Sequence, residues 1–247
     1  MALAQREPCE LAALGRAAEL PVEEAREAVA KLVQGGRIVV LGGPELRPNS
    51  LLCTAAGVAS LARRAGEALA AYHRQHPLRA GMAREELRSR LRLEPRAFSE
   101  VVGLWLRQGE LAEAAGALRL PKHQPQLTPP QQAEAAAFLE AIGASPFSPP
   151  TERLPEPGVL AYLEERGDVV RAGEVVFGAA AYREMVQRVV AHLRQHGTVT
   201  LAQVRDMFGT SRKYAQGLLE HLDQQRLTRR VGDERVLRRT EEADQWA

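Results

Sequence analysis

The chain has 247 residues, a formal net charge of +2 and a hydrophobic fraction of 45%. No stretch approaches the run of about 18 uncharged apolar residues that a membrane-spanning helix needs. No apolar run resembling a signal peptide follows Met1, so we expect a cytoplasmic protein without membrane contact. Aromatic residues make up only 4%, so the cores must be built mainly from Leu, Val and Ala.

The positive charge is concentrated near the carboxyl end. Only Lys31, Lys122 and Lys213 are lysines among 33 basic residues, so the abundance of arginine reflects a general bias and position must carry the argument. Residues 183–239 hold twelve Lys/Arg and six Asp/Glu, a net charge of +6, whereas residues 240–247 carry −3 and residues 1–182 carry −1. A basic region of this kind is typical of a nucleic-acid contact.

Cysteines and histidines give no sign of an enzyme. Cys9 and Cys53 offer neither a metal-ligand spacing nor a disulfide framework, so we expect both to be buried apolar residues. The six histidines form no nucleophile or metal pattern, and the pair His192 and His196 has no accompanying Glu or Cys. We therefore expect no catalytic residues, no metal site and no cofactor in this chain.

Four passages of the chain repeat one pattern, in which a helix-like run is followed by an apolar anchor residue and a glycine turn. The anchors are Ile38, Leu111, Val169 and Leu227, and the turn glycines are Gly42, Gly116, Gly173 and Gly232. Each anchor follows a Leu by five or six residues and precedes its glycine by four or five. The anchors are 73, 58 and 58 residues apart, so each unit is near the smallest size that folds alone.

Each glycine turn lies between short runs suited to strands, and helical periodicity precedes it. The predicted hairpin strands are 37–41 with 51–54 and 169–171 with 174–177, and the predicted helices include 22–34, 55–75 and 131–142. Helices followed by a two-stranded wing make a winged-helix module. We predict a mainly α protein with small β-hairpins (α+β), built from four tandem winged-helix domains in an elongated arrangement. Their predicted boundaries are 1–54, 55–122, 123–179 and 180–247, and the first unit is expected to lack a complete opening helix.

The last unit has the clearest helix-turn-helix pattern. A predicted helix over 181–195 is followed by a capping box at Thr200 and Gln203 that opens a short helix ending at Phe208. Gly209 forms the corner, and a third helix begins at Thr210 or Ser211. Its apolar stripe comprises Ala215, Leu218, Leu219 and Leu222, so Lys213, Gln216, Gly217 and Glu220 are expected to point outward, where Gly217 permits close backbone approach.

The predicted wing of this unit comprises 226–231, the turn Gly232-Asp233 and 234–239, and it carries six arginines. Cations on this wing and on the helix start are expected to share one surface and to straddle one phosphate backbone. Two interpretations remain open: charged residues on a hairpin edge also simply prevent sheet-to-sheet association, and Tyr214 suits internal packing as well as base stacking.

The segment 200–239, TLAQVRDMFGTSRKYAQGLLEHLDQQRLTRRVGDERVLRR, closely resembles the final winged helix of the selenocysteine-specific elongation factor SelB. The matching residues are Arg205-Asp206, Thr210-Ser211-Arg212-Lys213-Tyr214-Ala215, Leu219-Glu220, Asp223, Thr228, Arg230, Gly232-Asp233, Arg235 and Leu237. A second passage resembles the same family's tail of four winged helices through His73, Pro77-Leu78-Arg79, Gly81-Met82 and Glu85-Glu86-Leu87.

The resemblance implies a function in translation. In this family the tail binds the SECIS hairpin of the mRNA beside a UGA codon, and an amino-terminal part binds GTP and selenocysteinyl-tRNA on the ribosome. This chain has no GxxxxGK[ST] phosphate loop, so GTP and Mg²⁺ are expected only of a GTPase part that it lacks. The expected partners are therefore the SECIS hairpin, the ribosome and, through absent domains, the tRNA, with the chain itself a monomer.

The resemblance also implies which residues contact RNA. The predicted RNA-binding residues are Arg205, Ser211, Arg212, Lys213, Tyr214, Arg229, Arg230 and Arg235. Arg212, Lys213, Arg229, Arg230 and Arg235 are assigned to phosphates, and Ser211 and Tyr214 to nearby polar or stacking contacts. Two other functions remain open: a tandem winged-helix DNA-binding regulator, because the same geometry suits duplex DNA, and a protein-interaction scaffold, because residues 1–182 are nearly neutral.

Overall fold

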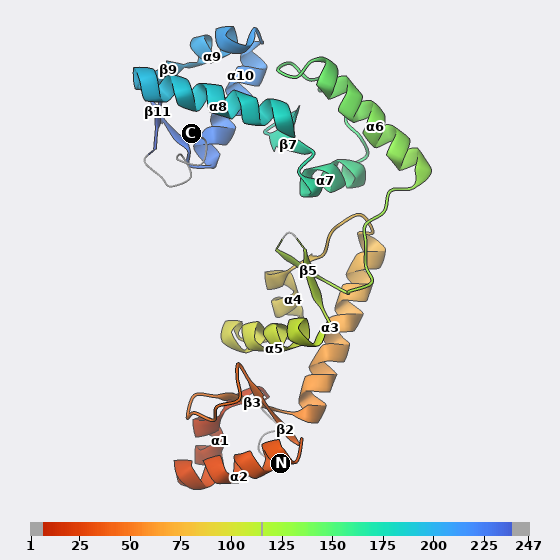
Figure 1. Cartoon of the computed structure of the whole chain (residues 1–247), viewed down its shortest axis with the longest axis vertical. Helices are drawn as coiled ribbons and strands as arrows, with labels where there is room; N and C mark the ends of the chain where they lie inside the picture. The colour runs from red at the N-terminus through yellow and green to blue at the C-terminus, as the bar shows by residue number, and fades with distance from the viewer. Residues whose placement is uncertain (1–6, 115, 239–247) are drawn as a thin grey trace. The chain divides into compact units, whose positions relative to one another are not determined.

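The computed structural model describes residues 7–114 and 116–238, and the chain divides into two compact units, Met1–Pro125 and Gln126–Ala247. Each unit combines helices with two small antiparallel sheets (Figure 1). This mixture confirms the predicted α+β class. Among the described residues, no helix is both long and apolar enough to span a bilayer.

The first unit begins with a small helical layer on a three-stranded sheet. Its elements are β1 (Cys9–Glu10), α1 (Leu11–Ala17), α2 (Val22–Gln34), β2 (Ile38–Leu41) and β3 (Leu51–Thr54), with the strand order β1-β3-β2. Strand β3 pairs with β2 from Ile38 opposite Thr54 to Leu41 opposite Leu51. The opening helix that the sequence predicted to be incomplete is α1, which has only seven residues.

The second part of this unit starts with a helix that follows strand β3 without an intervening loop. Its elements are α3 (Ala55–Gln75), β4 (Met82–Ala83), α4 (Arg84–Leu91), α5 (Pro95–Gln108), β5 (Ala112–Ala114) and β6 (Ala117–Arg119), with the strand order β4-β6-β5. Leu41 and Leu51 of the first sheet are buried in the same core as α3, α4 and α5. Because this core is shared, the two halves of the first unit support one another.

The second unit begins with two helices and a two-stranded hairpin. These elements are α6 (Pro129–Ala144), α7 (Pro157–Arg166), β7 (Val169–Ala172) and β8 (Val175–Gly178). Thr128 is the N-cap of α6 and prolines occupy its first turn, as the sequence predicted. The proline-rich segment between α6 and α7 contacts the last part of the chain through hydrogen bonds.

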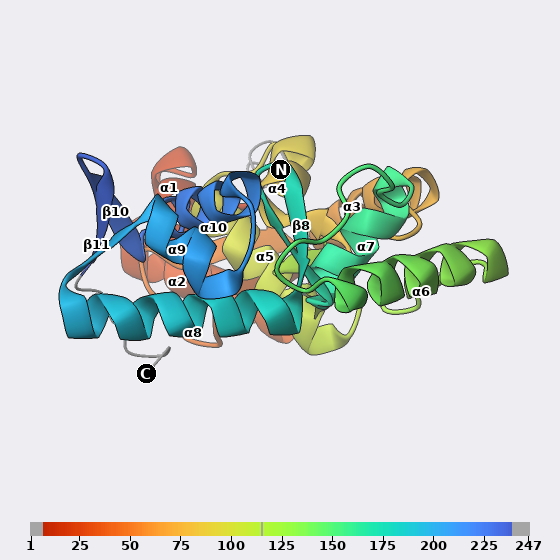
Figure 2. The ribbon, with the colours of Figure 1, turned by 90° about the horizontal axis from the view of Figure 1, so that it is seen from above.

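The last part of the second unit is a helix-turn-helix followed by a hairpin. Its elements are α8 (Ala179–His196), β9 (Thr198–Thr200), α9 (Leu201–Phe208), α10 (Arg212–Gln224), β10 (Thr228–Val231) and β11 (Glu234–Leu237), with the strand order β10-β11-β9. Figure 2 shows the hairpin of β10 and β11, hereafter the wing, projecting beyond α8, α9 and α10. The wing strands were predicted over 226–231 and 234–239. The structure has shorter strands, Thr228–Val231 and Glu234–Leu237, and Arg239 lies outside the described residues.

The repeated pattern found in the sequence corresponds to equivalent structural positions. All four anchors are buried, with exposures from 2% for Val169 to 6% for Ile38. All four turn glycines have positive φ, between 60° and 87°, a conformation that favours glycine. The four hairpins are therefore confirmed. The four domain boundaries stay a prediction, since neighbouring hairpins share a core within each unit.

Two details differ from the sequence analysis. The strands β1, β4 and β9 each add a third strand to a predicted hairpin; with two or three residues each they are too short to show an alternating pattern. Cys53 is buried as predicted, but Cys9 is only half-buried, because it lies on an edge strand of its sheet.

Candidate nucleic-acid interface

The helix-turn-helix of the last unit is fixed by local hydrogen bonds. The Thr200 hydroxyl accepts from the Gln203 amide at 3.2 Å, and the Gln203 side-chain oxygen accepts from the Thr200 amide at 2.8 Å. This is the predicted capping box, and it starts α9. Gly209 ends α9 in the left-handed region with φ 56°, and Ser211 is the N-cap of α10. Helix α10 therefore begins where the sequence predicted.

The start of α10 presents unneutralised positive charge. Arg212 and Lys213 are exposed in its first turn, and the side chain of Ser211 makes no capping hydrogen bond. The first backbone N–H groups of a helix have no intrahelical partner and favour an anion. The Lys213 Nζ donates to the Thr151 hydroxyl at 3.0 Å, a neutral partner that leaves the charge uncompensated. This helix start can hold a phosphate.

Tyr214 packs inward. Its hydroxyl donates to the Pro149 carbonyl oxygen at 2.9 Å, and its half-buried ring lies edge-on to Phe177 with centroids 6.4 Å apart. A ring held in this way on the core is not free to stack on a base. Of the two interpretations that the sequence left open for Tyr214, the structure favours packing.

The wing arginines point to alternate faces, because successive side chains in a strand do so. Arg229 is exposed, and among the described residues it makes no side-chain hydrogen bond or ion pair. Arg230, its neighbour, donates to the Gly232 carbonyl at 2.8 Å and lies 3.5 Å from the Asp233 carboxylate. Its side chain is 62% exposed, and such exposed pairs contribute little, so a phosphate can displace Asp233.

Arg205 is also paired with its neighbour. Its guanidinium lies 2.7 Å from the Asp206 carboxylate, with the two side chains 49% and 66% exposed. This is the solvated pair that adjacent charges suggest, and it weakens with salt. Arg205 therefore offers less free charge than Arg212 or Arg229.

Arg235 does not fit the role assigned to it. Its side chain is only 7% exposed, on the central strand of the last sheet, and its Nε donates to the Asp223 carboxylate at 3.4 Å. The other oxygen of Asp223 accepts from the buried Thr228 hydroxyl at 2.6 Å. A buried guanidinium with a carboxylate partner has no face for a phosphate. We assign Arg235 to the interior of the wing, where it ties β11 to α10.

Gly217 also has a different role from the expected one. A Cβ atom added there would lie 3.1 Å from the Ala172 carbonyl oxygen and 3.6 Å from a methyl group of Val175. The backbone that approaches Gly217 closely is therefore the turn between β7 and β8. The expectation that Gly217 faces a nucleic acid is wrong, because the β7–β8 hairpin packs against this position of α10.

Other contacts behind the helix-turn-helix were not foreseen. Arg188 of α8 lies 4.6 Å from the centre of the Phe208 ring and donates to the Met207 carbonyl at 2.6 Å, so this cation supports the end of α9. The Tyr182 hydroxyl lies 2.8 Å from Nδ1 of His221 and joins α8 to α10. Burial raises the pKa of Tyr182 to about 12 and lowers the pKa of His221, so both are neutral near pH 7.

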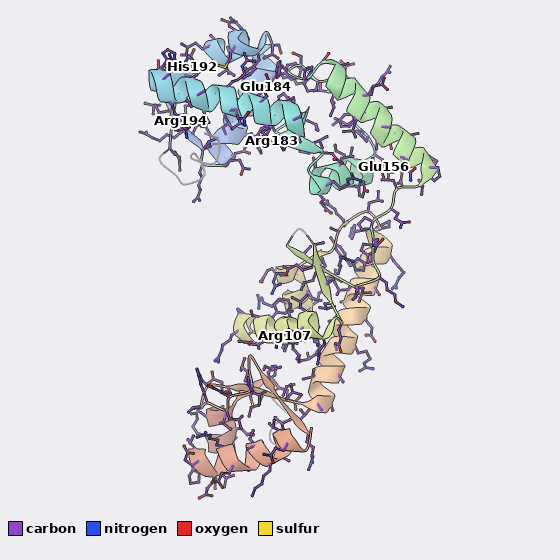
Figure 3. The ribbon with its side chains drawn as sticks, in the orientation of Figure 1. Arg107, Glu156, Arg183, Glu184, His192 and Arg194 are labelled. Carbon is purple, nitrogen blue, oxygen red and sulfur yellow. The ribbon has the colours of Figure 1, made fainter. Side chains whose placement is uncertain are left out.

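The remaining cations of α8 do not gather at one place. Arg183 and Arg194 lie toward opposite ends of this helix, with Glu184 and His192 also labelled along it (Figure 3). Among the described residues, no group of three His, Cys, Asp or Glu side chains could hold a metal ion. Within the described part of the helix-turn-helix and its wing, exposed cations without a carboxylate partner include Arg212 and Lys213 at the α10 start and Arg229 on the wing. Whether these two form one surface stays a prediction.

Two segments of the chain match family models described as "Elongation factor SelB, winged helix". Residues 67–120 match the model of the second winged helix, and residues 191–237 match that of the third. Both passages on which the sequence resemblance rests overlap these matches. These two segments of the chain are similar to winged helices of the SelB family. The last SelB winged helix is numbered third by its model but fourth by the repeat pattern, so the count of four stays a prediction.

A curated relative supports the same assignment. The selenocysteine-specific elongation factor of Desulfomicrobium baculatum is 28% identical over 218 residues, which cover 81% of this chain and 34% of the relative. The chain thus spans about a third of the length of this SelB relative.

Two solved structures are similar to the chain. The mRNA-binding domain of elongation factor SelB from E. coli, in complex with SECIS RNA, is 21% identical with a TM-score of 0.37, covering 45% of this chain and 99% of that one. The bacterial selenocysteine-specific elongation factor EF-Sec is 19% identical with a TM-score of 0.37, covering 79% of this chain and 32% of that one. Both structural similarities are weaker than the sequence matches, with scores below 0.5.

Proposed function

We propose that the last winged helix binds an mRNA hairpin of the SECIS type and that the chain serves selenocysteine incorporation at UGA codons. One observation carries this proposal: the segment that matches a SelB winged helix, 191–237, falls within the region 183–239 of net charge +6. Its exposed cations include Arg212 and Lys213 on the helix start and Arg229 on the wing.

A structured hairpin is the RNA that this site suits. An A-form stem hides its base edges in a deep, narrow groove, so a protein reads it by contacts to the backbone and to unpaired bases. Separate cations on a helix start and a hairpin favour phosphates over a continuous base-reading surface. With Tyr214 and Gly217 turned inward, we assign the backbone contacts to Arg212, Lys213 and Arg229, with Arg230 available once its exposed pair opens.

The remaining partners belong to the same proposal. A relative more than twice as long has room for parts that this chain does not match, and we place GTP hydrolysis and the binding of selenocysteinyl-tRNA there. The chain itself is a non-catalytic, monomeric RNA-binding part that works in the cytoplasm at the ribosome. GTP and Mg²⁺ are not its ligands.

The decisive experiment is a gel-shift series with four probes. A bulged SECIS-type hairpin is compared with the same stem without its bulge, a hairpin of scrambled loop sequence, and duplex DNA of equal charge. We expect the bulged hairpin to bind most tightly. Preference for the DNA duplex would favour a transcriptional regulator, and salt-insensitive binding, or no binding to any probe, would favour a protein-interaction scaffold.

A matched pair of lysine variants tests the assigned site. Lys213→Ala is expected to weaken hairpin binding and to lower the slope of log K against log salt by about 0.7 to 0.9, the loss of one phosphate contact. Lys31→Ala removes another exposed lysine, from α2 in the first unit, and should leave both quantities unchanged. Equal behaviour of the two variants would remove Lys213 from the interface.

A further inference from the structure

The start of α10 is held by a short segment that precedes it by about 60 residues in the chain. This segment, Phe147–Thr151, is hereafter the clamp segment. The Thr210 hydroxyl donates to the Phe147 carbonyl at 2.7 Å, and the Ser148 hydroxyl therefore donates to Thr210 at 2.8 Å, since one hydroxyl has one proton. The Tyr214 hydroxyl donates to the Pro149 carbonyl at 2.9 Å, and the Lys213 Nζ donates to the Thr151 hydroxyl at 3.0 Å.

The sequence of the clamp segment explains why its partners lie on another element. Pro149 and Pro150 have no N–H, so this stretch cannot form a regular backbone ladder of its own. Its part-buried carbonyl groups still need donors. Phe147 and Pro149 receive them from Thr210 and Tyr214.

Two donors at the start of the helix thus meet two carbonyl groups of the clamp segment: Thr210 meets Phe147, and Tyr214 meets Pro149.

Two further contacts hold the helix-turn-helix, one at the end of α9 and one on α10. The Phe147 ring packs against Phe208 at the end of α9, with centroids 5.2 Å apart. The hairpin turn between β7 and β8 lies against Gly217, three residues after Tyr214 in α10. The first two turns of α10 are thus fixed by the clamp segment and the β7–β8 hairpin, both of which precede the helix-turn-helix.

We propose that the clamp segment is a positioning element for the RNA-binding helix start, and that Thr210 and Tyr214 are positioning residues that do not contact RNA. This inference rests on the function proposed above. Holding Thr210 and Tyr214 leaves Arg212 free between them and sets the direction of Lys213. Because the helix start is ordered before RNA arrives, binding does not bear the cost of ordering it.

The test uses a pair of variants that each remove one hydroxyl group. Tyr214→Phe removes the hydrogen bond to Pro149 and keeps the ring. Tyr182→Phe removes the hydrogen bond to His221, about two turns further along α10, and serves as the control. For both proteins, hairpin affinity and hydrogen exchange of the amides of residues 212–215 are measured on the full chain.

We expect Tyr214→Phe to bind the hairpin about fivefold more weakly and to exchange these amides several-fold faster, the effect of one lost hydrogen bond. Tyr182→Phe should change neither affinity nor exchange at the helix start. Unchanged affinity and exchange in Tyr214→Phe would overturn the inference. Weaker binding with unchanged exchange would also overturn it, because Tyr214 would then contact RNA directly.

A wild-type chain that binds no hairpin would defeat the proposed function but would still leave the clamp testable. In that case the exchange measurement decides. Faster exchange at residues 212–215 in Tyr214→Phe would support positioning of the helix start, and unchanged exchange would reject it. Thr210→Val, which removes the second hydroxyl and keeps the side-chain shape, provides an independent repeat of both measurements.

Discussion

Replacing Asp223 by Ala tests the buried ion pair beneath the wing. The substitution leaves the Arg235 guanidinium, only 7% exposed, without a carboxylate, and the fully buried Thr228 hydroxyl without its acceptor. Breaking a buried pair on one side costs about 3–5 kcal/mol. Since Asp223 is itself 25% exposed, water reaches the vacated position, and we expect a loss near the lower limit, about 3 kcal/mol.

Two companion variants separate the charge from the hydrogen bond. Asp223→Asn keeps an acceptor for Thr228 but removes the negative charge, so we expect a smaller loss, about 1–2 kcal/mol. The double variant Asp223→Ala with Arg235→Met removes both charges. It should be more stable than Asp223→Ala alone, because no unpaired charge remains buried.

Urea unfolding followed by circular dichroism measures these differences. With a slope of about 2 kcal/mol per molar urea, a loss of 3 kcal/mol moves the midpoint by about 1.5 M. Hydrogen exchange of peptides covering residues 226–238 then locates the loss in the wing, because the first unit has separate cores. A loss below about 0.5 kcal/mol for Asp223→Ala, or no recovery in the double variant, would refute the assignment of Arg235 to the interior.

Three further predictions concern other parts of the chain. Arg229→Ala should weaken hairpin binding and lower its salt slope by about 0.7 to 0.9, and an unchanged slope in a filter-binding titration would place Arg229 outside the interface. Burial lowers the pKa of His73 to about 4, so the unfolded chain binds a proton at this histidine more readily than the folded chain. The contribution of His73 to the free energy of unfolding should be complete above about pH 6.5 and fall by about 2 kcal/mol toward pH 4. Urea midpoints of His73→Gln should lack this part of the decline. Thr200→Ala should cost about 1 kcal/mol of unfolding free energy by removing the capping box of α9, and a calorimetric melt identical to that of the wild type would contradict this.

The sequence predicted most of the secondary structure because the signals are local. Helices α2 and α3 have the predicted limits, Val22–Gln34 and Ala55–Gln75, because helical periodicity is a pattern of neighbouring residues. The turn glycines marked the hairpins for the same reason: a positive φ is a property of one residue and does not depend on distant neighbours. The net charge of +6 in residues 183–239 likewise follows from the residue types alone.

The roles of individual site residues depended on what the fold brings beside them. Arg229 and Arg235 look alike in the sequence, yet one is exposed on the wing and the other is buried against Asp223, twelve residues earlier. Nothing local distinguishes them, because the burial of a strand residue depends on which face of the sheet meets the helices. Tyr214 and Gly217 resembled RNA contacts for the same reason.

The sequence by itself thus determined the helices, the hairpins and the place of the positive charge, since each follows from residue type and spacing along a few turns of chain. The tertiary structure decided which of those charges are free and which motif residues face inward. That decision depends on contacts between segments some 60 residues apart, such as Tyr214 with Pro149, and no local pattern encodes such a contact.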